Sequence, residues 1–417
     1  GIRDLSRVVP NVSIRSLSDS DHTIVIRGVS NINGSSALVG IYMDEVPLSI
    51  SPQLQANLQA MDVQRLEVLR GPQGTLYGQG SSGGTIRYIT NNPSFDGFKG
   101  EIGASTSKIT DGGTNSEVKA ILNIPVIDDH LAFRLVTNYK DTGGWIDQPD
   151  IGKKNTNDNE ASYVRLKTLW QPSDDLTINA MVLRSRSDTG HRNVTNIRSA
   201  NGDTYYRTVA RDGLSLPTTD FHDSNDIYNL TVNYDLGFAT LTSSSSQIDI
   251  ETTYASLSSG VGHDPLVNSG FMLVDGFSKA KGFTQEIRLA SADNDNDNDN
   301  ALDWIIGAFY TDTETTLGVE DIGFYFDGVG ASFGGNRTFR SSESTALFAN
   351  VGYNFSEQLT LTVGGRYFED DRTLEQSGLL VPKSDSFNHF SPMISLAYAI
   401  GDDASIYASV AEGFRSG

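Results

Sequence analysis

The chain contains no cysteine among its 417 residues, so disulfides, thiolate metal sites and cysteine nucleophiles are all excluded. It also lacks a run of about 18 apolar residues, which is the length that a membrane-spanning helix requires. Basic residues are few, since 31 Lys and Arg stand against 52 Asp and Glu, for a formal net charge of −21. Because nucleic-acid binding needs a basic surface that neutralises phosphates, no nucleic-acid partner is expected.

Glycine and aromatic residues, by contrast, are abundant. The chain has 41 Gly, 16 Tyr, 19 Phe and 3 Trp with only 12 Pro, a composition typical of turn-rich β-structure. The mean hydropathy of −0.29 leaves a β-barrel membrane protein open, because barrel strands are short and face lipid only at every second position. The length fits two domains, one of them a barrel.

About thirteen runs after residue 99 alternate between apolar and polar residues, which is the period of a β-strand. In residues 359–367, one face carries Leu359, Leu361 and Val363, while the other carries Thr360 and Thr362. A soluble β-sandwich would give the same alternation with its apolar face turned inward. Alternation alone therefore leaves the class of β protein open.

The connections between these runs alternate in length. The short ones cover residues 125–130, 171–175, 235–238, 353–358 and 400–404, and the long ones cover 141–160, 187–222, 251–278, 311–340 and 371–388. Short turns at one end and long loops at the other are typical of outer-membrane barrels. This pattern predicts a membrane all-β barrel of antiparallel strands over residues 98–417.

The first 97 residues lack the long alternating runs of the rest of the chain. Short strands are predicted at residues 22–29, 37–46, 65–69 and 84–90, with a helical turn or more at 53–61. We therefore expect a small mixed α/β domain over residues 1–97. A compact unit placed before a barrel suits the filling of a wide lumen.

Residues 62–90 match two enzyme motifs when only the letters are compared. Gly78, Gly80 and Gly83 fit a dinucleotide fingerprint, and Ser82 between glycines fits a nucleophile elbow. Both motifs require a helix to follow, but residues 85–90 alternate as a strand. The six histidines show no metal-ligand spacing, and no catalytic grouping is found. We predict no enzyme, no cofactor and no metal site.

Four blocks in the first 97 residues resemble the plug of TonB-dependent outer-membrane receptors. They cover residues 26–28, 39–47, 65–78 and 83–90. Residues 286–289, 364–367 and 407–415 are similar to barrel strands of that family. The resemblance implies an N-terminal plug inside a barrel in the outer membrane of a Gram-negative bacterium.

The resemblance also implies that the sequence is a fragment. Barrels of this family close with about 22 strands, against the thirteen or so predicted here. The segment that contacts TonB would precede Gly1, no signal peptide is visible at the start, and the rest of the barrel would follow Gly417.

For function, the resemblance implies active uptake of a scarce, bulky nutrient, above all an iron–siderophore complex. The partners would be TonB with its inner-membrane energising complex, a small-molecule ligand such as a metal chelate, and the lipid bilayer. Carbohydrate, cobalamin or aromatic compounds are alternative solutes. A passive porin or an assembly-type barrel is an alternative of another class, and a soluble propeller would need a blade repeat, which is not found.

Charge pairs between plug and barrel are expected to hold the plug in place. The predicted plug residues are Arg27, Glu67, Arg70 and Arg87, and the barrel residues that would face them are Arg134, Arg165, Glu286, Arg288 and Arg366. The alternative is that each is independently solvated. A gating or structural role is assigned to Gly28, Gly71, Pro72, Gly74, Gly78, Gly80, Gly83 and Gly84, since glycine permits tight turns and close backbone approach.

Ligand contacts are predicted in two polar plug loops and in the long barrel loops. The plug candidates are Asn31, Asn33, Ser35, Ser36, Ser49, Ser51, Gln53 and Gln55, and the barrel candidates are the aromatic residues Trp145, Tyr205, Tyr206, Tyr254 and Phe324. The alternative for the aromatics is packing within the loops. The run at residues 293–300 hints at Ca²⁺, but it lacks the glycine and distal glutamate of a calcium loop, so a solvated turn is predicted.

Overall fold

Three β-sheets organise the computed structural model. It describes residues 5–16, 22–30, 38–50, 61–78, 80–147, 153–190, 220–261, 270–292, 302–326, 329–378, 381–401 and 404–413. One sheet has thirteen strands, and two small sheets have three and four. Among these residues, no helix combines the length and apolar character that crossing a membrane requires.

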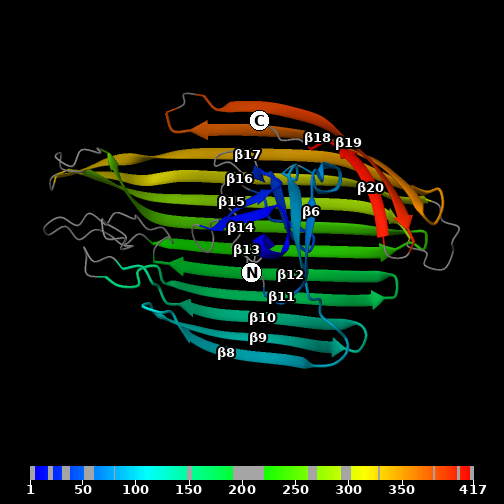
Figure 1. The fold of residues 1–417 in the computed structure, drawn as a ribbon, viewed down its shortest axis with the longest axis horizontal. Helices are drawn as coiled ribbons and strands as arrows, with labels where there is room; N and C mark the ends of the chain where they lie inside the picture. Colours follow the sequence, from blue (N-terminus) through cyan, green and yellow to red (C-terminus); the bar gives the residue numbers. More distant parts are fainter. Residues whose placement is uncertain are drawn as a thin grey trace.

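The thirteen-stranded sheet, called the large sheet below, is antiparallel throughout and follows the order of the sequence (Figure 1). Its strands are β8 (Lys99–Lys108), β9 (Thr114–Ile127), β10 (Leu131–Thr142), β11 (Asn159–Ser173), β12 (Leu176–Thr189), β13 (Phe221–Asp235), β14 (Ala239–Val261), β15 (Gly270–Ser291), β16 (Leu302–Phe326), β17 (Val329–Asn354), β18 (Leu359–Gln376), β19 (Lys383–Ile400) and β20 (Ala404–Ala411). The predicted strand number and antiparallel arrangement are confirmed.

The two faces of the large sheet differ as the alternation requires. On β17, Leu347 is 65% exposed on the outer face, whereas its neighbours Ala346 and Phe348 are each 4% exposed on the inner face. Exposed apolar side chains recur at the same level on the next strands, where Leu347 pairs with Tyr367 and Tyr367 with Phe390. This outer face is the one that suits lipid.

Three predicted long loops prove to be mostly strand. β14 and β15 extend through residues 251–261 and 270–278, β16 and β17 through 311–326 and 329–340, and β18 and β19 through 371–376 and 383–388. The apolar alternation fades there because both faces of these extensions are rich in Ser, Thr, Gly and acidic residues. A strand that leaves the lipid no longer needs an apolar face, so the sequence signal is lost while the hydrogen-bonded ladder continues.

The N-terminal part, called the plug below, comprises the described residues between 5 and 90. Its three-stranded sheet joins β1 (Val12–Ser16), β2 (His22–Ile26) and β3 (Val29–Ser30), and its four-stranded sheet has the order β5 (Val46–Pro47), β4 (Val39–Met43), β7 (Gly84–Thr90), β6 (Val63–Arg70). Two one-turn helices accompany them, α1 (Leu5–Val8) and α2 (Gly74–Tyr77). The predicted strands at 22–29 and 37–46 are each divided by a tight turn, and the predicted helix at 53–61 lies almost wholly outside the described residues.

The plug packs against the inner face of the large sheet, with β6 and β7 running across the barrel strands (Figure 1). One hydrophobic cluster joins the two parts. It includes Ile24, Ile26, Met43 and Ile86 of the plug with Val136, Tyr163, Leu183, Ile227 and Ile248 of the large sheet. This shared core brings charged residues of the plug to the wall of β10, β11 and β15.

Candidate functional site

The plug presents three carboxylates to the large sheet from two chain reversals. Asp44 and Glu45 form the turn between β4 and β5, and Asp62 directly precedes β6. Asp44 and Asp62 have φ values of 51° and 53°. Asp tolerates this left-handed conformation better than most residues, so both positions can carry a carboxylate where the chain turns sharply.

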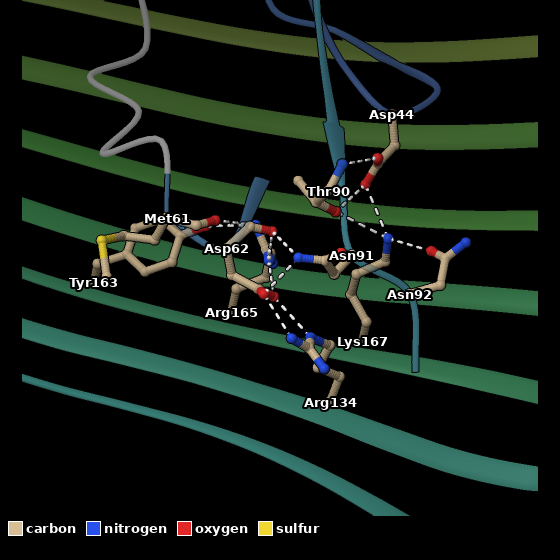
Figure 2. Close-up of polar contacts among 10 residues, drawn as sticks. All are labelled: Asp44, Met61, Asp62, Thr90, Asn91, Asn92, Arg134, Tyr163, Arg165 and Lys167. Atoms are coloured by element: carbon tan, nitrogen blue, oxygen red, sulfur yellow. Dashed lines mark hydrogen bonds and ion pairs between the residues drawn. The ribbon is translucent and has the colours of Figure 1, made fainter. Parts of the chain in front are cut away.

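The side-chain carboxylate of Asp62 accepts four hydrogen bonds (Figure 2). Arg134 of β10 binds it through Nε at 2.7 Å and Nη2 at 2.6 Å, and Arg165 of β11 adds Nη2 at 2.8 Å. Asn91, just after β7, donates from Nδ2 at 2.8 Å. The side chains of Asp62 and Arg165 are 3% and 0% exposed, so this pair is shielded from water. Such charge-assisted bonds are about twice as strong as neutral ones.

Arg165 is held in place by further oxygens. Its Nη1 donates to the carbonyl oxygen of Met61 and to the hydroxyl of Tyr163, both at 3.1 Å. The same guanidinium therefore binds the backbone and the side chain at the start of β6. A single barrel residue thus fixes both the charge and the chain direction of the plug at this point.

The protonation of Asp62 gives a first testable expectation. Burial alone raises the pKa of Asp62, but the hydrogen bonds from Arg134 and Asn91 and the charges of Arg134 and Arg165 outweigh it and hold the pKa below the ordinary 3.8. Because the folded pKa is depressed, this stabilisation is complete above pH 3.8 and is lost as the pH falls through the lower folded value. Hydrogen-exchange protection factors of β6 and β7 in the full-length protein should therefore be flat between about pH 5 and 8 and fall in acid. The Asp62→Asn variant should lack the acid-dependent part of the fall, and an equal fall in both would contradict the assignment.

Asp44 forms a second contact, next to the first (Figure 2). Its Oδ2 accepts from Nζ of Lys167 at 3.1 Å, and this ammonium also donates to Oγ1 of Thr90 at 2.9 Å and to Oδ1 of Asn92 at 2.6 Å. Asp44 in turn accepts from the backbone N–H and the hydroxyl of Thr90. Lys167 thereby joins the end of β7 to the β4–β5 turn, and its side chain is 6% exposed.

Glu45 makes the third contact, on β15. Nη1 of Arg288 lies 2.8 Å from Oε2 of Glu45 and 2.8 Å from Oε1 of Glu286. The three side chains are 22–31% exposed, so water screens this group more than the other two. It holds the plug to the large sheet less strongly.

Arg366 of β18 meets the plug without a carboxylate partner in the part of the chain that the structure describes. Its guanidinium lies over the rings of Phe309 and Phe348, 5.2 and 5.4 Å from their centroids. It also lies against Gly78, where an added Cβ would be 2.9 Å from Nη2. Gly78 has φ 69° and ends α2, so only glycine both turns the chain here and leaves room for the guanidinium.

The structure places the residues predicted for these contacts as follows. Arg134, Arg165 and Arg288 do reach the plug, but their partners are Asp62 and Glu45. Glu67 and Arg87, which were predicted to face the barrel, pair with each other across β6 and β7 at 2.9 Å, and Glu67 also binds Arg65. Arg27 and Arg70 are exposed. Antiparallel register places Glu67 opposite Arg87, so the nearest opposite charge is within the plug's own sheet.

Asp44, Glu45, Asp62 and Lys167 were not singled out by the sequence. Lys167 lies on the polar face of its strand, so the alternation marks it as inward-facing without naming a partner. The three acids stand at strand ends, where they look like ordinary turn residues. The glycines with positive φ among the predicted set are Gly28, Gly71, Gly78, Gly80 and Gly84, whereas Gly83 lies close to Val29 and Pro72 is exposed.

Of the predicted ligand contacts, three have described side chains. The Ser49 hydroxyl accepts from the backbone N–H of Ile41 at 2.9 Å, so it serves the plug's own fold. Trp145 lies in the connection between β10 and β11 and is 47% exposed. Tyr254 lies on β14 rather than in a loop and stacks on Phe221 at 5.8 Å. Phe324 is likewise in a strand, β16. The remaining candidates, Asn31, Asn33, Ser35, Ser36, Ser51, Gln53, Gln55, Tyr205 and Tyr206, lie outside the described residues, as does the acidic run at 293–300.

No group of three or more His, Asp or Glu side chains is arranged to hold a metal ion within the described ranges. Three histidines there have identified neighbours, namely the carbonyl oxygen of Gln171 for His130, Asp188 for His222 and Glu412 for His389. The polar contacts described above hold the plug against the large sheet.

Family models match both parts of the chain. The model "TonB-dependent Receptor Plug Domain" matches residues 1–85, and the model "TonB dependent receptor-like, beta-barrel" matches residues 154–417. The plug match ends within β7, and the barrel match covers all strands from β11 onward.

The chain is also similar to individual receptors in sequence and in fold. The pesticin receptor of Yersinia enterocolitica serotype O:8 is 25% identical over 99% of this chain and 58% of its own length. In fold, the chain is similar to the ferric yersiniabactin uptake receptor FyuA of Yersinia pestis, with a TM-score of 0.78 and 22% identity over 98% of this chain and 61% of that one. The siderophore receptor PiuA of Acinetobacter baumannii gives 0.74 at 16% identity, covering 98% and 61%. The chain thus spans 58% of the length of the curated relative. Because the barrel model alone matches more than half of the residues and the plug model matches most of the rest, the chain belongs to the TonB-dependent receptor family.

Proposed function

We propose that the whole protein is an outer-membrane importer in which the plug blocks the barrel lumen until TonB, with its inner-membrane energising complex, pulls on it. The observation that supports this most is the polar contact between plug and sheet. A buried ion pair at Asp62 and a partly buried one at Asp44 hold the plug beside the hydrophobic cluster that it shares with the large sheet. Polar contacts can be exchanged for water on release, which a purely apolar seal does not permit at low cost.

The proposed solute is an iron–siderophore complex. The names of the similar proteins support this, since they include a ferric yersiniabactin uptake receptor and siderophore receptors. Carbohydrate, cobalamin and aromatic compounds are the alternatives. Trp145, half-exposed between β10 and β11, is the described residue best placed for a ligand contact. Catalysis and a bound cofactor have no part in this proposal.

The proposal divides the chain into a plug over residues 1–97 and a barrel over residues 98–417. In its support, β7 ends at Thr90 and β8 begins at Lys99. The segment between them is tied to the barrel, because Asn123 of β9 binds the backbone of Ser94 through both its side-chain oxygen and nitrogen at 2.8 Å. The plug is therefore tied to the large sheet at its C-terminal end.

Uptake measurements in the bacterium that carries the full-length gene test this function. Radiolabelled iron is supplied as ferric citrate, as ferric yersiniabactin and as the siderophore in the bacterium's own culture supernatant. Deletion of the receptor is expected to reduce uptake of one of these by about tenfold or more, and deletion of TonB should reduce it equally, since transport by this class depends on that energy. Re-expression of the receptor restores uptake.

Two results would contradict the proposal in different ways. Uptake that persists without TonB indicates a passive pore. Unchanged iron uptake together with lost growth on a carbohydrate, on cobalamin or on an aromatic compound keeps the importer and replaces the solute. The control is a second TonB-dependent receptor in the same strain, whose own solute should still enter when this receptor is deleted.

A further inference from the structure

Among the described residues, the ion pairs between the plug and the large sheet lie on β10, β11 and β15. At β10 and β11, the Asp62 carboxylate accepts three hydrogen bonds of 2.6–2.8 Å from Arg134 and Arg165, and the Arg165 side chain is fully buried. Lys167 on β11 adds three donated bonds of 2.6–3.1 Å. At β15, the Glu45–Arg288 pair is 25–31% exposed. The charge-assisted contacts are thus concentrated on one wall.

The opposite wall is contacted by α2, which lies against β17, β18 and β19. The approach is close, since a Cβ on Gly74 would lie 3.1 Å from the carbonyl oxygen of Glu412 and 3.8 Å from Oγ of Ser391. Three buried polar atoms here have no hydrogen-bond partner among the described residues, namely Oγ1 of Thr75, Nε of Arg366 and Oγ of Ser391. Thr75, Arg366 and Ser391 are 1–3% exposed, so the chain itself covers them.

The free energy of separating the plug therefore differs between the wall formed by β10 and β11 and the wall formed by β17, β18 and β19. Separation at β10 and β11 breaks a cluster of charge-assisted bonds, each about twice as strong as a neutral hydrogen bond, before water can replace them. Separation at β17 to β19 exposes polar atoms that gain hydrogen bonds to water which they lack in the closed state. The closed plug is thus held by charge-assisted bonds at β10 and β11, where Nε of Arg165 lacks a partner among the described residues, whereas no such bond accompanies the three unpaired atoms at β17 to β19 in the described part of the chain.

We propose that the plug is hinged on β10 and β11 and parts first from β17, β18 and β19. The Glu45–Arg288 pair on β15 lies between the two walls and breaks next. Resting on the proposed import function, this places the route of the solute along the β17–β19 wall. Asp62, Arg134, Arg165 and Lys167 are then positioning residues of the hinge, and Gly74 and Gly78 lie at the parting surface.

Single engineered cysteines test the order of parting, because residues 1–417 contain no cysteine of their own. In the full-length receptor, with any cysteine outside these residues replaced, Ser391→Cys reports on the α2 wall and Val136→Cys on the hinge wall. Both side chains are small and buried, at 1% and 0% exposed, and Val136 packs in the shared core two residues from Arg134. Isolated outer membranes are treated with a small maleimide in rising urea, and each rate is divided by the rate in receptor denatured with hot detergent.

At moderate urea, we expect Ser391→Cys to react about tenfold or more faster than Val136→Cys, as local opening precedes release of the hinge. Adding Asp62→Asn to Val136→Cys should bring its rate close to that of Ser391→Cys, whereas adding Asp96→Asn, which alters an exposed ion pair with Lys99, should leave it unchanged. Equal rates for the two cysteines, or faster reaction at Val136→Cys, overturn the hinge. Since no solute or TonB energy enters this experiment, its failure leaves the import proposal standing, and failure of the uptake test leaves the hinge standing.

Discussion

Replacing Asp62 with asparagine is expected to lower the free energy of opening of β6 and β7 by about 3–5 kcal/mol, because it removes one member of a buried ion pair. Arg165 would keep its bonds to Met61 and Tyr163, but its charge and that of Arg134 would face a neutral amide. The loss is larger than that of an ordinary hydrogen bond, since the guanidinium of Arg165 is fully buried and cannot be rehydrated in place.

Hydrogen exchange of the full-length receptor measures this effect directly. Protection factors of the β6 and β7 amides should fall by about 10²–10⁴-fold in Asp62→Asn. The matched control is Asp96→Asn, which removes a carboxylate from an ion pair whose members are 63% and 76% exposed. That variant should differ from the wild type by less than about fivefold. Equal protection in Asp62→Asn and in the wild type would show that the cluster does not hold the plug.

Replacing Gly84 with alanine should destabilise the plug by about 2–5 kcal/mol, through backbone strain and overpacking together. Gly84 has φ 144°, and a Cβ there would lie 2.5 Å from the carbonyl oxygen of Leu69 and 3.3 Å from Cδ1 of Ile26. The residue stands in the middle of the four-stranded sheet, opposite Arg70 on one side and Val39 on the other. No flexible side chain can move away to relieve the contact with the Leu69 backbone.

Gly97→Ala separates the two causes. Gly97 also has a positive φ, 106°, but nothing lies within 4 Å of an added Cβ, so only the backbone term of about 1–3 kcal/mol applies. Urea titration of both full-length variants, followed by proteolysis of the plug, should give a lower midpoint for Gly84→Ala than for Gly97→Ala. Equal urea midpoints for the two variants would show that the close contact with the Leu69 carbonyl oxygen does not destabilise Gly84→Ala.

Most of the large sheet can be predicted because its physical requirement is local. A strand between lipid and lumen needs apolar and polar side chains at alternating positions. The strands from β8 to β20 can therefore be predicted from the alternation in their own residues. The strand extensions at 251–261 and 329–340 could not be found in this way. Outside the lipid, neighbouring strands keep pairing through backbone hydrogen bonds, which leave no mark on side-chain periodicity.

For the contacts between plug and large sheet, likewise, the part that depends on local sequence can be predicted and the rest cannot. The inward position of Arg134 and Arg165 follows from strand period, but their partner Asp62 stands 72 and 103 residues away in the sequence. Which plug carboxylate meets them depends on how the four-stranded sheet lies across β10 and β11, and no local pattern encodes that angle. Glu67 attracted the prediction because it stands in the recognisable block, yet its register gives it Arg87 as a nearer partner.

The central strands of the large sheet are long enough to extend well beyond the lipid. β16 has 25 residues, which at about 3.4 Å per residue and a tilt of about 40° rise roughly 60 Å, against an apolar band about 25 Å tall. Its outer face is apolar at Leu302 and Ile306 and becomes charged from Asp312 onward. More than half of the strand therefore stands in water as a continuous hydrogen-bonded ladder. The edge of the large sheet therefore stands well clear of the lipid headgroups, and backbone hydrogen bonds hold its strands together there.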